Sequence, residues 1–263
     1  MKTANEFFEL IREKGLWTLS MSDARELFAL DQPSYDAVVT LLMTDNGNYE
    51  RSLHDYQYSD VWMCQMAGCH LFTLRPNLAV YETVLRGTLK IADPSSCRDP
   101  VDALLQVKSK GDVVLDFLKL IQLNKTDPDT DETNSRIFNM FYAMKYDRSW
   151  PEYHVYALSQ KYGEFLQQSN EMGHPSTPAT APDEALRISM LILETMLDLF
   201  EANNSNQTAR VIIAWLTLSD KDHQGSYRER VIRAFTSASQ STDEYVRHRV
   251  SHPHSLMNIK RNI

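Results

Sequence analysis

Cys64, Cys69 and His70 are the residues whose types and spacing come nearest to a metal site, with His54 before them and Cys97 after them. Thiolate and imidazole are the usual ligands of structural zinc, whose paired ligands are separated by about two to four residues. Four residues separate the first two cysteines, but no second pair completes the set of ligands. Cysteine also behaves as a small apolar residue in protein cores. The pattern therefore favours buried structural cysteines, and a zinc site is the weaker hypothesis.

An acidic segment in the middle of the chain begins like a calcium-binding loop. Asp127, Asp129 and Asp131 occupy its first, third and fifth positions. The rest of the pattern is absent, because Glu132 replaces the glycine of the turn and Phe138 replaces the bidentate glutamate. We therefore expect a solvated loop that supplies acids to the first turn of the next helix.

Glycine is scarce, with eight residues in 263, and the closest two are ten residues apart. Loops that cradle phosphate or turn sharply beneath a nucleophile usually need clustered glycines, because only glycine reaches positive φ without strain. The sequence therefore contains no P-loop, no dinucleotide-binding fingerprint and no nucleophile elbow. Most glycines, such as Gly15 and Gly47, fall between predicted helices or at their ends. We predict no catalytic residue, no metal and no cofactor, and an enzyme is the disfavoured class.

Positive charge is concentrated near the end of the chain. The net charge is −8, yet residues 227–263 contain seven basic residues and only three acidic ones. Such asymmetry predicts contact with an acidic partner. The competing interpretation pairs this segment with acidic side chains of the same protein. The predicted partner-binding residues are Arg228, Arg230, Arg233, Arg247, Arg249, Lys260 and Arg261.

Residues 22–42, from Ser22 to Leu42, resemble a helix-turn-helix segment with a turn at residues 29–31. Two features oppose DNA binding. Arg25 occupies the crowded position where the motif usually has alanine, and the second helix carries Asp31 and Asp36 but no lysine or arginine. An ordinary helical hairpin is the favoured interpretation.

Helical periodicity and capping residues predict an all-α fold, a multi-helix globular bundle. Ser22 and Asp112 are predicted to cap helices, and Pro33 to open one. A small hairpin near residues 46–60 is an alternative there, and residues 61–74 fit helix or strand. A further helix is predicted to begin at Asp99 and Pro100. The other predicted helices cover residues 3–13, 22–30, 33–43, 78–89, 112–121, 137–142, 151–165, 184–201, 211–218, 226–239 and 242–250.

The most apolar predicted helix covers residues 184–201. Projection at about 100° per residue gathers its large apolar side chains on a broad surface and leaves a narrow polar stripe. A helix this apolar lies at the centre of a core or in a subunit interface. The broad surface includes Leu186, Met190, Leu193, Leu197 and Phe200, and the polar stripe comprises Arg187, Glu194, Asp198 and Glu201.

Three prolines lie among small polar residues in residues 173–183, which predicts an extended connector. We expect an N-terminal helical region over residues 1–172 and a C-terminal helical unit with a basic tail over residues 184–263. Three cysteines cannot form a disulfide framework. The sequence shows no signal-peptide pattern and no apolar run of about eighteen residues, so we expect a cytoplasmic, intracellular protein without a membrane span.

These features lead to a first functional hypothesis of a non-catalytic helical protein–protein interaction or assembly protein, which binds a protein partner or associates with itself. The alternative is a nucleic-acid-binding protein that uses residues 22–42 or the basic C-terminal segment. A metal protein that uses Cys64, Cys69 and His70 is the third hypothesis.

Overall fold

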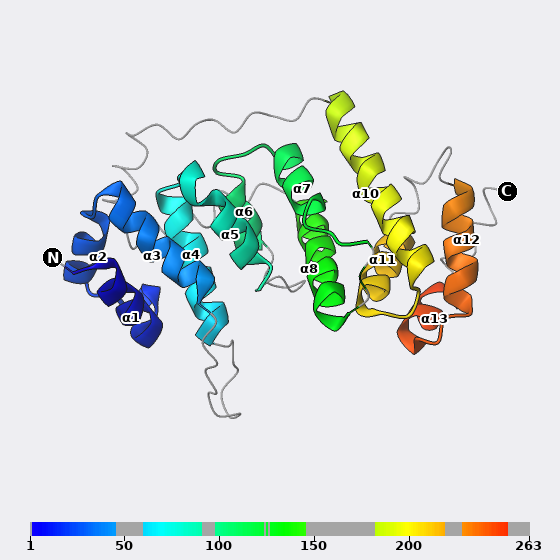
Figure 1. The fold of residues 1–263 in the computed structure, drawn as a ribbon, viewed down its shortest axis with the longest axis horizontal. Helices are drawn as coiled ribbons and strands as arrows, with labels where there is room; N and C mark the ends of the chain where they lie inside the picture. Colours follow the sequence, from blue (N-terminus) through cyan, green and yellow to red (C-terminus); the bar gives the residue numbers. More distant parts are fainter. Residues whose placement is uncertain are drawn as a thin grey trace. The chain divides into compact units, whose positions relative to one another are not determined.

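A computed structural model gives the fold of the chain and describes residues 2–45, 60–90, 98–123, 125, 127–145, 182–218 and 228–251. These residues form twelve α-helices and two 3₁₀ helices, and none of them lies in a strand (Figure 1). The all-α prediction is therefore confirmed, and residues 61–74 are helical. The alternative hairpin lies outside the described residues except for Asp60, which begins a helix. The helix predicted over residues 151–165 also lies outside them.

The chain divides into two compact units. Unit 1 comprises Met1–Val113 and Ala143–Ala179, and unit 2 comprises Val114–Tyr142 and Thr180–Ile263. Residues 114–142 thus group with the C-terminal part of the chain, because Asp131 in this segment is hydrogen-bonded to backbone far along the sequence. The connector over residues 173–183 remains a prediction, since only its last two residues are described.

Unit 1 is built around α3 (Gln32–Thr44). This helix packs against three others, and α4 also packs against α6. Tyr35, Val38 and Leu42 of α3 are completely buried, so the helix forms the centre of the apolar core. The other elements are α1 (Ala4–Lys14), η1 (Leu16–Thr18), α2 (Met21–Phe28), α4 (Asp60–Leu74), η2 (Leu78–Val80), α5 (Tyr81–Thr88) and α6 (Arg98–Leu104). The helices that contact α3 most closely are α1, α4 and α5.

Two helices start at caps other than the predicted ones. The hydroxyl of Ser20, rather than that of Ser22, accepts the backbone N–H of Asp23 at 3.1 Å and begins α2. Ser109 accepts the backbone N–H of Asp112 at 3.1 Å at the start of α7 (Lys110–Leu118). Each serine hydroxyl also donates to the carboxylate three residues later, at 2.6 and 2.7 Å. The reciprocal bonds explain why the helix begins at the serine.

Three helices of unit 1 meet at Met43, near the end of α3. A Cβ atom at Gly68 of α4 would lie 2.5 Å from the Met43 sulfur, and one at Gly87 of α5 would lie 2.8 Å from the Met43 carbonyl oxygen. Carbon atoms in favourable contact are about 3.5–4.0 Å apart. Both glycines therefore let α4 and α5 approach α3 closely. The sequence did not indicate this role, because the glycines were expected mainly at helix ends.

Unit 2 contains α8 (Pro128–Lys145), α10 (Pro182–Ala202), α11 (Gln207–Leu218), α12 (Arg228–Ser239) and α13 (Glu244–Ser251). α10 packs against α11 and α12, and α13 packs against α11 and α12. Phe138 and Phe117 each meet Phe141 edge to face, with ring centroids 5.7 and 6.2 Å apart. The helices predicted over residues 184–201, 211–218, 226–239 and 242–250 are all present, with small shifts of their ends.

Polar bonds join the turn between α10 and α11 to the turn between α12 and α13. The Asn204 amide donates to the Ser237 hydroxyl at 2.6 Å. Ser241 donates to the Asn204 carbonyl at 2.7 Å, and its hydroxyl lies 2.9 Å from that of Ser205. Because Ser241 is buried, loss of these partners would leave its hydroxyl unsatisfied.

Asp131 of α8 holds the start of α11. Its two carboxylate oxygens accept the backbone N–H groups of Gln207 and Thr208 at 2.9 and 3.0 Å, and its carbonyl accepts the Thr208 hydroxyl at 2.9 Å. The first N–H groups of a helix have no partner within the helix, and the positive end of the helix dipole favours a carboxylate there. One side chain of α8 therefore caps a helix more than 70 residues away.

Replacement of Gly87 with alanine should destabilise the protein by about 1–3 kcal/mol, the usual cost of overpacking. The Met43 backbone cannot move away from the new Cβ atom without displacing α3. Gly68→Ala should cost less when Met43 is also changed to alanine, because the shortest contact at Gly68 is with the Met43 side chain. Urea unfolding of the single and double variants gives the measurement. A Gly87→Ala protein as stable as the parent would contradict the close approach.

Replacement of Asp131 with alanine should lower the free energy of unfolding by about 1–3 kcal/mol, because two backbone N–H groups at the start of α11 lose the carboxylate that accepts them. Asp129→Ala is the matched control, since Asp129 lies in the same first turn of α8 with an exposed side chain. Thermal unfolding of both variants compares them. If both variants lost the same free energy of unfolding, Asp131 would act only as an acid in the first turn of its own helix.

Candidate functional site

The apolar side chains of α10 are buried at Ile188 and toward the C-terminal end, and partly exposed between these positions. Toward its C-terminal end, Met196, Leu197, Leu199 and Phe200 are all buried. These residues cover a wide arc of the helix, which agrees with its contacts to both α11 and α12. The C-terminal half of α10 is thus part of the core of unit 2, which agrees with the prediction that this helix lies either in a core or in a subunit interface.

The preceding turn of α10 is as apolar but is not buried. Met190 is 42% exposed, and Leu191, Ile192 and Leu193 are each only partly covered. Successive residues of a helix point about 100° apart, so these four side chains face four directions. Ile188, which lies just before this turn, is buried, so one side of α10 is packed here as well. Residues 190–193 thus expose Met190 and parts of three further apolar side chains, and we call this turn the α10 surface.

Charged residues border the α10 surface. Arg187 and Glu194 are both exposed and lie seven residues apart, which places them on the same side of the helix two turns apart. Further along, Arg230 of α12 donates to Asp198 at 2.7 Å and to Glu201 at 2.9 Å. The bond from Arg230 holds the pKa of Glu201 below its ordinary value. The polar stripe of α10 is thus bound to α12 near its C-terminal end.

The predicted partner-binding arginines lie in different environments. Arg230 binds the acids of α10. This contact agrees with the interpretation that pairs the basic segment with acidic side chains of the same protein. Arg247 donates to the Ser241 carbonyl at 2.6 Å, Arg249 is half-buried, and Arg233 is exposed. The side chain of Arg228, together with Lys260 and Arg261, lies outside the described residues. Two of the four described arginines therefore serve contacts within unit 2, and partner binding by the set remains a prediction.

The packing of residues 22–42 disfavours DNA binding by this segment. The second helix would have to enter a groove of DNA, but α3 packs against α1, α4 and α5, and the face that it leaves open carries Asp36 and no lysine or arginine. Asp36 accepts hydrogen bonds from Gln32 at 2.7 Å and from Asn77 at 2.5 Å. These contacts bind the polar side of α3 to neighbouring residues of unit 1.

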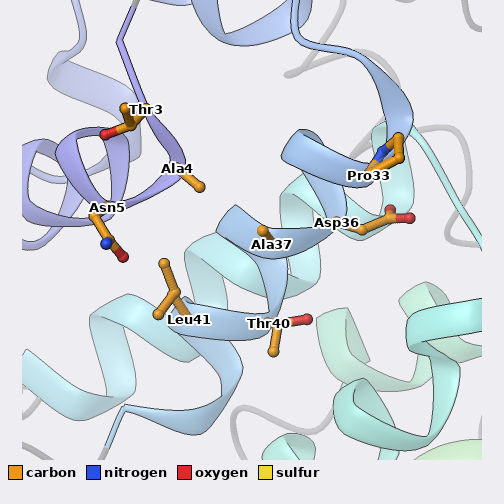
Figure 2. A pocket seen from close by; sticks show the side chains of 8 residues that line it. All are labelled: Thr3, Ala4, Asn5, Pro33, Asp36, Ala37, Thr40 and Leu41. Atoms are coloured by element: carbon orange, nitrogen blue, oxygen red, sulfur yellow. The ribbon is translucent and has the colours of Figure 1, made fainter.

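A shallow groove of about 660 Å³ lies between α1 and α3 (Figure 2). Ala4, Asn5 and Leu41 approach one another across it, while Asp36 and Thr40 lie farther along α3. The Asp36 carboxylate already accepts two bonds, so the groove offers no cluster of reactive groups. No sequence pattern indicated this groove, because its walls come from separate helices. The lining residues are Thr3, Ala4, Asn5, Pro33, Asp36, Ala37, Thr40 and Leu41.

The structure does not assemble the suggested metal ligands. Cys64 and Cys69 are buried on α4, and their positions differ by about 140° around the helix. His70 is packed edge to face against Trp17, with centroids 5.2 Å apart. Within the described parts of the chain, no three His, Cys, Asp or Glu side chains gather closely enough to hold a metal ion. Cys97 lies outside these parts.

The acidic segment is helical rather than a loop, which corrects the sequence expectation. α8 begins at Pro128, directly after Asp127. The Asp127 carboxylate accepts the backbone N–H of Thr130 at 3.0 Å and its hydroxyl at 2.9 Å, and these bonds lower the Asp127 pKa. Asp129 and Asp131 then stand in the first helical turn, where the helix dipole favours acids.

No helix among the described residues combines the length and the apolar character needed to cross a membrane.

Replacement of Arg230 with glutamine should lower the free energy of unfolding by about 0.5–1 kcal/mol near neutral pH, since the ion pairs are partly exposed. The Glu201 pKa is lowered in the folded protein, so its contribution is complete above the ordinary glutamate pKa and is lost as pH falls through the folded value. The difference between the two proteins should therefore shrink in acid. Urea unfolding at several pH values measures it beside Arg233→Gln, whose charge also lowers the Glu201 pKa but less strongly and without a hydrogen bond, so its effect should be smaller. A difference independent of pH would contradict this account.

Comparisons of the chain with protein-family models, with curated proteins and with solved structures found no match.

Proposed function

We propose that the protein is a non-catalytic helical interaction or assembly protein, and that it binds its partner through the α10 surface. One observation carries the proposal: four successive apolar residues, Met190 to Leu193, are all at least partly exposed. Large apolar side chains grouped on a surface are typical of protein–protein contacts.

The anchoring of α10 supports the same proposal. Its C-terminal half is buried in unit 2 and bound by Arg230, so the α10 surface belongs to a helix that is already ordered. Binding to a preformed helix costs less conformational entropy than binding that must first fold a segment. Methionine and leucine side chains also adapt to the shape of a partner, which suits a contact surface.

The nucleic-acid alternative has less support. Its strongest described candidate, Arg230, is bonded to two carboxylates of the same unit. A phosphate would have to displace both acids to reach it. A pull-down with and without nuclease therefore distinguishes nucleic-acid binding from protein binding.

Replacement of Met190 with aspartate should weaken partner binding at least about tenfold, because it places an unpaired charge in an apolar contact. Met63→Asp is the matched control. Met63 is the same residue type, has the same exposed fraction of 42% and lies on a helix of unit 1. Circular dichroism should show equal helix content for both variants.

Binding can be measured by light scattering of the purified protein and by quantitative pull-down from lysate, with and without nuclease. Loss of association with Met190→Asp but not with Met63→Asp would support the proposal. A strictly monomeric protein that captures no macromolecule would overturn it, as would binding that nuclease abolishes and that Met190→Asp leaves unchanged.

A further inference from the structure

The groove between α1 and α3 has a mostly apolar lining (Figure 2). Ala4 of α1 and Ala37 and Leu41 of α3 are all partly exposed in it, and the ring of Pro33 is exposed at the start of α3. The groove follows α3 over residues 33–41, which is about 12 Å along the helix axis at 1.5 Å per residue. A groove between two helices can receive the apolar face of a third helix.

Two carboxylates lie at this groove, and the hydrogen bonds that they accept come from neutral groups. Asp36 lines the groove and accepts bonds from the side-chain amides of Gln32 and Asn77. Glu6 accepts the backbone N–H and the hydroxyl of Thr3, a lining residue, at 2.7 and 2.9 Å, and these bonds lower the Glu6 pKa. Neutral donors leave the negative charge of a carboxylate in place, and neither acid forms an ion pair with a described residue.

The bases nearest to the groove are held by other groups. Lys2 pairs with two carboxylates of α2 at 2.9 and 3.3 Å. Arg75 donates to the Gln32 amide oxygen at 2.8 Å, so the Gln32 side chain lies between its charge and that of Asp36. The lining residues include no lysine or arginine. Two carboxylates and one guanidinium thus leave an excess of negative charge at the groove, which is complementary to a basic partner.

We infer that the groove between α1 and α3 is a docking site for a basic amphipathic helix of a partner protein. The apolar face of that helix packs against Ala4, Ala37 and Leu41, and its lysine or arginine side chains lie beside Asp36 and Glu6. A groove about 12 Å long holds about two turns of such a helix, with apolar anchors three or four residues apart. The α10 surface takes no part in this contact, so the inference goes beyond the proposed function and does not rest on it.

The groove is shallow and short, which sets the expected strength of the contact. A contact of two helical turns lies below the usual size of stable interfaces. We therefore expect a dissociation constant on the order of 100 µM for a single helix. Because the charges border the groove at the surface, the affinity should fall as salt concentration rises.

Two synthetic peptides test the docking site. The first has about 15 residues, enough to form a helix in part, with leucine and alanine on one face and lysine on the other. The second has glutamate in place of each lysine. Fluorescence anisotropy gives the dissociation constants, and amide chemical shifts of the protein locate the binding. The lysine peptide should bind at least about tenfold more tightly, with the largest shifts in residues 3–5 and 33–41.

Variants of the groove separate its shape from its charge. Ala37→Gln fills the groove with a longer neutral side chain that favours helix, and it should weaken binding of the lysine peptide at least about tenfold. Glu6→Gln and Asp36→Asn should each weaken it about threefold, and glutamine retains the capping role of Glu6. Glu244→Gln removes an exposed acid from α13 and should leave binding unchanged. Circular dichroism identifies any variant that loses helix.

The outcomes separate this inference from the proposed function. A parent protein that binds neither peptide, or that binds both equally, would overturn the inference. Unchanged binding by Ala37→Gln, or shifts confined to other residues, would also overturn it. Met190→Asp should leave binding of the lysine peptide unchanged, and a loss would assign the peptide to the α10 surface instead. Failure of the groove to bind therefore leaves the proposed function intact.

Discussion

The anchoring of α10 in the core of unit 2, which leaves Met190 to Leu193 partly exposed, is the constraint on which unit 2 and the proposed function both depend. Met196 and Phe200 bind the helix into the core, and Arg230 joins its acids to α12. Asp131 of α8 holds the start of α11, and hydrogen bonds join the turn after α10 to the turn after α12. With one end held in this way, residues 190–193 are presented as an ordered surface. The free energy that orders the surface comes from the core, so a partner does not have to supply it.

The packing of unit 1 depends on the close approach of α4 and α5 to α3 around Met43. This packing leaves α3 open only on the face toward the groove with α1, and that face carries Asp36 and no basic residue. Apolar periodicity predicted the helices of both units because their buried faces determine that pattern. It did not predict which helix would be central. That outcome depends on Gly68 and Gly87, whose role appears only when helices distant in the sequence are packed together.

The candidate site was predictable only in part. The sequence identified α10 as unusually apolar. Apolar residues recur with the same spacing at its buried and its partly exposed positions, so only the packed structure separates the two. The cluster of arginines could be identified by counting charged residues along the sequence. The bonds from Arg230 to Asp198 and Glu201 could not be predicted in this way, because they form only when α12 lies beside α10. Helix caps were misplaced by two or three residues, because Ser20 and Ser109 compete with nearby polar residues for the same role. Local pattern thus predicted elements well and tertiary partners poorly.

The central claim is that the α10 surface is where this protein binds its partner. Hydrogen–deuterium exchange, followed by mass spectrometry of the free protein and of its complex, tests the claim directly. The account predicts slower exchange on association over residues 187–194, with little change in the already buried residues 196–200. Unchanged exchange over residues 187–194, with protection elsewhere in the chain, would contradict it.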